Sequence, residues 1–310
     1  MTTTAKPQFQ TEVERILDQL RTHREREALA HAGRRVTAGQ LFELTHRLAW
    51  ALRARGLGRG QSITFLTGNL PEAIAARHAA NLLGCRINHL YNGLAADVQA
   101  VMTAQVETSA LIVDPRYADR AAHLAREVLI DQTLTLGPAP IGADLLRAAA
   151  TGPTAPFPSQ ARPEDVRSIR YSGGTTGQPK GICITYGQVR SFGPPLPNDE
   201  PQPPRLLVCT TLAHAAGLMT DKILAAGGRV VLQESFDAAA VLRAIETERI
   251  TDLFLATPLL YQLADHPDAA HADTSSLRRL VYGGAAASPL PARRRSAVAG
   301  TSPDADVRPA

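Results

Sequence analysis

Short apolar runs alternate with amphipathic helical patterns along most of this chain, and this alternation is the feature that most restricts its fold. The runs "SITFLTG" (62–68) and "ALIVDP" (110–115) are typical of buried strands, and residues with helical spacing follow each of them. Strands that alternate with helices favour crossover connections, and therefore sheets whose strands are mainly parallel. The sequence predicts an α/β protein with two α/β subdomains.

We expect the chain to divide at a polar, proline-rich stretch, "TGPTAPFPSQARP" (151–163), which is typical of a linker. Residues 1–150 then form the first α/β subdomain, and residues 164–288 form the second one, with the glycine-rich loop described below. From residue 289 to residue 310 the periodicity stops, and only three large aliphatic residues remain. This tail is expected to be irregular or disordered.

Charge and cysteine content exclude several classes of function. The formal net charge is only +4 and the arginines are dispersed, so the chain lacks the dense basic stripe of a nucleic-acid-binding protein. The three cysteines are widely separated and lack metal-ligand spacing, which favours buried reduced thiols. The N-terminal segment has no long apolar run, which argues against a signal peptide or membrane anchor. We expect a cytoplasmic protein that binds neither membranes nor nucleic acid.

The string "YSGGTTGQPKG" (171–181) concentrates glycine, threonine and a lysine in eleven residues. The phosphate loop of nucleoside triphosphatases requires Gly-Lys-Ser/Thr at the start of a helix. Here Pro179 separates the last loop glycine from Lys180, and a β-branched run follows. The pattern therefore predicts a strand, a loop and a second strand.

The composition of this loop favours a phosphate ligand over the alternative, a tight hairpin rich in turn residues. Glycines allow positive φ and a close approach of the backbone, and consecutive amides can form an anion-binding nest. Hydroxyl groups and one lysine add donors and positive charge. A turn alone needs only two or three such residues. The residues expected to hold phosphate are Ser172, Gly173, Gly174, Thr175, Thr176, Gly177 and Lys180.

The string resembles the signature loop of the AMP-forming adenylating enzymes, which include acyl- and aryl-CoA synthetases, nonribosomal adenylation domains and luciferase. The usual form is Tyr-Thr-Ser-Gly-Thr-Thr-Gly-x-Pro-Lys-Gly, and this chain departs from it at Ser172 and Gly173. Four further stretches are similar to the same family: "NLPEAIAARHAANLLGCRINHLYNGL" (69–94), "TTLAHAAGL" (210–218), "LFLATPLLYQL" (253–263) and "LVYGGAAAS" (280–288).

The resemblance implies a reaction in two steps. A carboxylate attacks the α-phosphorus of ATP and gives an acyl-adenylate and pyrophosphate. A thiol of coenzyme A, or of a phosphopantetheine carrier protein, then takes the acyl group. The resemblance also implies that the loop holds the β- and γ-phosphates, with Lys180 as a catalytic residue and with Mg²⁺ bound through Thr175. A solvated surface lysine is the alternative for Lys180.

The resemblance places the acyl pocket and the adenine contacts in the second half of the chain. His214 is the second catalytic candidate, as a residue that orients the carboxylate or gates the pocket; a half-buried structural histidine is the alternative. Gly283, Gly284 and Ala285 are expected beside adenine and the acyl group, unless they form a simple turn. Tyr261 suits the core as well as the pocket wall. Small apolar neighbours favour an aryl or medium hydrophobic acid over an amino acid.

The family continues beyond its Gly-Ala strand with motifs that this chain lacks: Tyr-Gly-x-Thr-Glu, a ribose-binding Asp and a small C-terminal lid domain with a second lysine. The sequence therefore suggests a truncated or frameshifted chain, or one half of a two-polypeptide enzyme, that is weakly active alone. An unpaired sheet edge would favour self-association. The alternative function is a non-catalytic nucleotide- or acyl-binding partner of the same fold.

Overall fold

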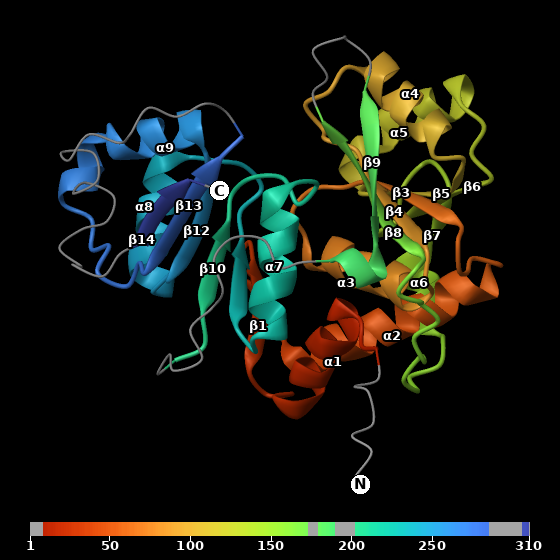
Figure 1. Ribbon diagram of the computed structural model, residues 1–310, viewed down its shortest axis with the longest axis horizontal. Helices are drawn as coiled ribbons and strands as arrows, with labels where there is room; N and C mark the ends of the chain where they lie inside the picture. Colours follow the sequence, from red (N-terminus) through yellow and green to blue (C-terminus); the bar gives the residue numbers. More distant parts are fainter. Residues whose placement is uncertain (1–8, 173–178, 190–201, 285–305, 310) are drawn as a thin grey trace, which may run out of the picture. The chain divides into compact units, whose positions relative to one another are not determined.

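The computed structural model describes residues 9–172, 179–189, 202–284 and 306–309 (Figure 1). The chain forms two compact units, and each is built around one seven-stranded sheet. The units interleave along the sequence: the first holds residues 1–18, 43–66 and 75–190, and the second holds residues 19–42, 67–74 and 191–310.

The sheet of the first unit has the strand order β7-β6-β5-β3-β4-β8-β9. Every neighbouring pair is parallel except the last, because β9 runs antiparallel to β8. The strands are β3 (Ser62–Leu66), β4 (Arg86–His89), β5 (Thr108–Val113), β6 (Gln132–Thr135), β7 (Ala143–Asp144), β8 (Val166–Ser172) and β9 (Lys180–Thr185). The helices that connect them are α3 (Pro71–Leu82), α4 (Ala96–Gln105), α5 (Ala118–Glu127) and α6 (Leu145–Ala150).

Strand β5 forms the centre of a hydrophobic core in this unit. Leu111 and Val113 of β5 lie in one buried cluster with Met102 of α4 and Leu124 of α5. Both helices follow a strand and present alternate apolar residues to the sheet, as the alternation in the sequence predicts. The core therefore fixes α4 and α5 against β5.

The sheet of the second unit has the strand order β14-β13-β12-β10-β11-β1-β2. All described neighbours are parallel except the hairpin of β1 and β2. The strands are β1 (Glu27–His31), β2 (Arg34–Thr37), β10 (Arg205–Val208), β11 (Arg229–Leu232), β12 (Asp252–Ala256), β13 (Arg279–Gly283) and β14 (Asp306–Pro309). The helices after β10, β11 and β12 are α7 (Ala215–Ala225), α8 (Ala238–Glu248) and α9 (Thr257–Ala264).

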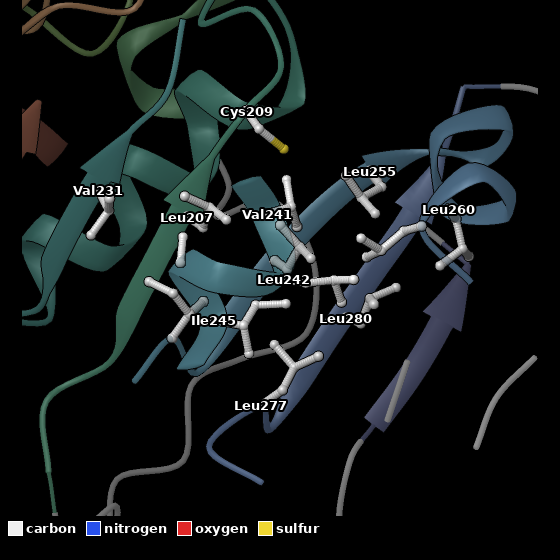
Figure 2. Close-up of a cluster of buried hydrophobic side chains, with 14 of the residues drawn as sticks. Leu207, Cys209, Val231, Val241, Leu242, Ile245, Leu255, Leu260, Leu277 and Leu280 are labelled. Carbon is white, nitrogen blue, oxygen red and sulfur yellow. The ribbon is translucent and has the colours of Figure 1, made fainter. Parts of the chain in front are cut away.

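Helices α8 and α9 cover one face of this sheet. Figure 2 shows Val241, Leu242 and Ile245 of α8 among side chains from the strands, including Leu207 and Leu280. The side chain of Asp237 caps α8 by accepting a hydrogen bond from the Ala240 amide at 2.7 Å. The mixed α/β architecture with mainly parallel sheets confirms the fold class that the sequence predicts.

The boundary between the two sheets is not at residues 151–163, where the sequence analysis places a linker. Strands β8 and β9 follow that segment, yet β8 pairs with β4 in the first sheet. Part of the segment is also packed: the Phe157 amide donates to His46 Nδ1 at 2.9 Å, and the Trp50 indole donates to the Ala155 carbonyl at 2.9 Å. Burial lowers the pKa of His46 to about 4, so the imidazole stays a neutral acceptor at ordinary pH. The proline-rich stretch therefore docks on α2 (Ala38–Ala54) within the first unit.

Three strands of the second unit, β1, β2 and β14, are not predicted from the sequence. Strand β14 lies within the tail for which no regular structure is expected, and it pairs in parallel with β13. Its four residues contain one aliphatic side chain, too few to show a period. The hairpin of β1 and β2 turns at Ala32 and Gly33, which both have positive φ. The turn residues are Ala-Gly in place of the usual Asn-Gly, and alanine is rare at positive φ. The sequence therefore gives no hairpin signal at this position.

A salt-bridge network predicts how acid affects the second unit. The Arg35 guanidinium, which donates to both oxygens of Glu248 at 3.0 and 2.7 Å, lowers the pKa of Glu248 to about 2, and Arg229 adds to this effect. This contribution to stability is complete above the unfolded pKa near 4.5 and is lost as pH falls towards 2. Glu248→Gln should reduce the loss in free energy of unfolding between pH 4.5 and pH 2 by about 1 kcal/mol, as measured by urea titrations. Glu246→Gln, at an exposed position of the same helix, should leave the pH dependence of the unfolding free energy unchanged. If both variants show the same pH dependence, the Arg35–Glu248 pair does not cause it.

Candidate active site

The glycine-rich segment is held between the two strands of the hairpin β8–β9. The register pairs Arg170 with Ile182, Tyr171 with Gly181 and Ser172 with Lys180. Ser172 is thus the last paired residue before the loop, and Lys180 is the first paired residue after it. A strand follows the loop, so the helix-opening phosphate loop is excluded and the strand–loop–strand prediction is confirmed. Five of the predicted phosphate-binding residues lie outside the described part of the chain: Gly173, Gly174, Thr175, Thr176 and Gly177.

Tyr171 anchors the hairpin to the core of the first unit. Its hydroxyl donates to the Met102 carbonyl at 3.2 Å, and its ring packs against the cluster around Leu111. Burial raises the pKa of Tyr171, with a smaller contribution from Cys183, so the hydroxyl remains a donor. A Cβ at Gly181 would lie 2.9 Å from the Ile169 side chain and 3.6 Å from the Tyr171 ring. Glycine at this position therefore lets the two strands and the ring pack closely.

Lys180 is exposed at the first position of β9, beside the paired backbone of Ser172. Beyond the far end of β9, Tyr186 is buried and its hydroxyl hydrogen-bonds to the carbonyls of Asn81 and Cys85 at 3.1 and 3.0 Å. The hairpin is thus fixed at its base, at the end of β9 away from Lys180.

The second unit brings three predicted segments to one edge of its sheet. Strands β10, β12 and β13 are neighbours and parallel, so their last residues, Val208, Ala256 and Gly283, lie at the same carboxyl edge. In the sheet, β11 lies on one side of β10, and β12, the next strand along the chain, lies on the other side of β10. Such a reversal of direction is a topological switch point, where open α/β sheets bind their ligands.

The predicted site residues of the second unit differ in exposure and in their contacts. His214 is exposed and immediately precedes α7, and Gly283 pairs in register with Ala256. Gly284 has φ +85°, and a Cβ there would have no neighbour within 4 Å among the described atoms, so its glycine serves the backbone conformation. Tyr261 is half-buried and packs against the core cluster under α9. Ala285 lies outside the described residues.

The structure does not collect all predicted residues into one unit. Ser172 and Lys180 belong to the first unit, and His214, Tyr261, Gly283 and Gly284 belong to the second. The second unit also contains a buried polar residue near this edge for which the sequence predicts no role, Asn69. Its buried carboxamide hydrogen-bonds to Thr210, Leu212 and Gln233 at the carboxyl edge. In the sequence, Asn69 is the first residue of the family-like stretch 69–94, where no role is predicted for it.

Two further observations limit the chemistry. Among the residues that the structure describes, no three or more His, Cys, Asp or Glu side chains are grouped so that they could hold a metal ion. No helix in the same part of the chain has the length and apolar character needed to cross a membrane.

Comparison with known proteins assigns the chain to a family. The family model described as AMP-binding enzyme matches residues 16–305, and the chain belongs to this family. Over 287 residues it is 34% identical to the medium/long-chain-fatty-acid–CoA ligase FadD8 of Mycobacterium tuberculosis, a match that covers 89% of this chain and 50% of that protein. Over 270 residues it is 34% identical to a feruloyl-CoA synthase of an Amycolatopsis species, which covers 86% and 52% of the two chains.

A solved structure agrees with this assignment. The chain is 35% identical to the amide bond synthetase McbA from Marinactinospora thermotolerans, with a TM-score of 0.83, and the match covers 97% of this chain and 59% of that one. The chain therefore spans about half the length of the curated relatives it matches. These matches confirm the family that the loop and the four other stretches suggested.

Proposed function

We propose that this chain takes part in the ATP-dependent, AMP-forming activation of a carboxylic acid, followed by transfer of the acyl group to a thiol. One observation carries the proposal: the β8–β9 hairpin presents a glycine- and threonine-rich loop with Lys180 at its mouth, in a chain of the AMP-binding enzyme family. The relatives named above act on fatty and feruloyl acids as CoA ligases or synthases. Since the reaction consumes ATP and coenzyme A, we place it in the cytoplasm.

In this proposal the loop and the hairpin bind the polyphosphate of ATP. The amides of Gly173 to Gly177 and the hydroxyls of Ser172, Thr175 and Thr176 donate hydrogen bonds to the β- and γ-phosphates, and Lys180 supplies positive charge. Phosphoryl transfer depends mainly on such positioning and neutralisation. Holding the pyrophosphate leaving group would leave the α-phosphorus open to the carboxylate.

Mg²⁺ enters the proposal only as part of the ATP complex. The described residues do not form a ligand group for a resident metal ion, and the predicted ligand Thr175 lies outside them. Thr175 as a ligand remains a prediction.

The carboxyl edge of the second sheet is the proposed place for the acyl group and adenine. His214 would orient the carboxylate, and the backbone of Gly283 and Gly284 would lie against the adenylate. The small residues at this edge, Ala256 among them, suit an aryl or medium hydrophobic acid. Tyr261 would contribute a wall from α9. We propose coenzyme A as the acceptor of the acyl group. Because the chain is similar to an amide bond synthetase, an amine is the alternative acceptor to test.

The test uses ATP labelled at the α-phosphate and a panel of aryl and fatty acids with the 310-residue polypeptide. Because the chain spans about half the length of its relatives, we expect slow acid-dependent formation of AMP and acyl-adenylate, with no ADP, and little thioester when coenzyme A is added. Formation of ADP would contradict the proposal. Tight binding of a non-hydrolysable acyl-adenylate mimic without any acid-dependent AMP would instead favour the non-catalytic alternative, a nucleotide- or acyl-binding partner.

A further inference from the structure

The side chain of Asn69 connects two loops at the carboxyl edge of the second sheet. Its Nδ2 donates to the carbonyl oxygens of Thr210 and Gln233 at 2.9 and 2.8 Å, and its Oδ1 accepts from the Leu212 amide at 3.2 Å. The residue is 3% exposed. Asn69 lies in the segment 67–74, which belongs to the same unit as its three partners. The loops after β10 and β11 are therefore tied to one buried amide.

Only a primary amide satisfies these three partners. Two of them are carbonyl oxygens and need donors, while the third is an N–H group and needs an acceptor. Asparagine uses both amide hydrogens and its oxygen. An aspartate of almost the same shape would place an oxygen against two carbonyl oxygens, and a serine could donate only once. The contact is thus specific for the residue type.

Two of the partners of Asn69 lie directly before His214 in the chain, in the segment that leads into α7. Thr210 and Leu212 flank Thr211, whose hydroxyl accepts from the Ala213 amide at 3.2 Å. The His214 carbonyl then accepts from the Gly217 amide at 3.1 Å, in the first turn of α7. The third partner, Gln233, directly follows β11, the strand beside β10. Asn69 consequently fixes the path of residues 210–214 relative to the sheet.

We propose that Asn69 is a positioning residue for the adenylation reaction: it holds the 210–214 turn and thereby sets the position of the His214 imidazole at the carboxyl edge. This inference rests on the function proposed above. Asn69 does not contact the reacting groups in this account; it acts through His214.

A double-mutant cycle tests this coupling. The probes are benzoyl- and decanoyl-sulfamoyladenosine, with affinities measured by calorimetry for the wild-type chain, Asn69→Asp, His214→Ala and the double variant. Asn69→Asp should weaken binding of the better probe about tenfold or more, because two buried carbonyls lose their donors. In the His214→Ala background the same change should cost less than about threefold. Effects that multiply, or wild-type affinity in Asn69→Asp, would overturn the proposal.

A matched control separates positioning from general destabilisation. Thr251→Val removes a hydroxyl that accepts from the Arg205 amide at the amino edge of the same sheet, and it should leave probe affinity unchanged. If it weakens binding as much as Asn69→Asp does, Asn69 is only structural. Should Asn69→Asp fail to fold, Asn69→Ser provides the same comparison, since serine supplies one hydroxyl donor in place of the amide and adds no charge.

Hydrogen exchange gives a readout that does not depend on the proposed function. Asn69→Asp should speed exchange of the amides of residues 210–217, and of the Leu212 amide most of all. Exchange unchanged at this turn would overturn the proposal even if the probes bind. If the wild-type chain binds neither probe, the proposed function fails, while faster exchange confined to this turn would still support the role of Asn69 in holding it.

Discussion

Asp252→Ala is expected to lower the free energy of unfolding of the second unit by about 3–5 kcal/mol, the cost of removing one member of a buried ion pair. Asp252 is 1% exposed, and its carboxylate accepts from Nε and Nη2 of Arg279 at 2.5 and 2.9 Å. The Thr251 hydroxyl donates to it at 2.6 Å. Urea titration followed by circular dichroism, together with hydrogen exchange in β12 and β13, measures the effect.

A second cation explains why the loss should be large. Burial lowers the pKa of Lys222 in α7, and the positive charge of Arg279 lowers it further, while Asp252 raises it. Removing Asp252 leaves both cations in a buried region. Lys222→Met should therefore recover part of the loss in the Asp252→Ala background.

The double variant Asp252→Leu/Arg279→Met is the matched comparison. It replaces the pair with apolar side chains, so it should be clearly more stable than Asp252→Ala. If Asp252→Ala costs less than about 1 kcal/mol, or if the double variant is no more stable than the single one, the buried pair does not have the role described here.

Lys180→Ala is expected to weaken binding of ATP by about tenfold to a hundredfold and to leave binding of AMP almost unchanged. A hydrogen bond to a charged group contributes about 1.5–3 kcal/mol, and the proposed partners of Lys180 are the β- and γ-phosphates, which AMP lacks. Lys180 is exposed at the end of the hairpin, so its loss should not alter the fold. Calorimetric titrations with both nucleotides measure the difference.

Lys180→Arg is the matched control because it keeps the charge and changes its shape. Thirty of the 33 basic residues are arginines, yet a lysine stands here. We expect the Arg variant to bind ATP more weakly than the wild type but more tightly than Lys180→Ala. Equal losses for ATP and AMP in Lys180→Ala would show that Lys180 does not contact the polyphosphate.

The sequence predicts those parts of the fold that are encoded locally. Strands β3 and β5 are apolar runs bounded by turn residues, and β9 follows Pro179 as a β-branched run, so all three are visible in the sequence. The pairing of β8 with β4 is not visible, because it depends on tertiary contacts across the proline-rich segment 151–163. The same holds for β1, which pairs with β11 about 200 residues further along the chain.

The candidate site shows the same limit. The glycine-rich loop is evident because its composition is itself the binding chemistry. His214 and Gly283 are evident only through the resemblance to a family, since neither residue type is distinctive alone. Asn69 begins the family-like stretch 69–94, but its contacts are not evident from the sequence, because its three partners are backbone groups. Positioning residues of this kind require a structure.

The central claim is that the loop between β8 and β9 binds the polyphosphate of ATP so that a carboxylic acid can be joined to AMP. Calorimetric titration of the folded 310-residue polypeptide with ATP and magnesium, and with benzoyl- and decanoyl-sulfamoyladenosine, tests it most directly. The account predicts saturable binding of ATP and of at least one acyl-adenylate mimic. Absence of binding to every one of these ligands, in a sample whose circular dichroism shows a folded α/β protein, would contradict it.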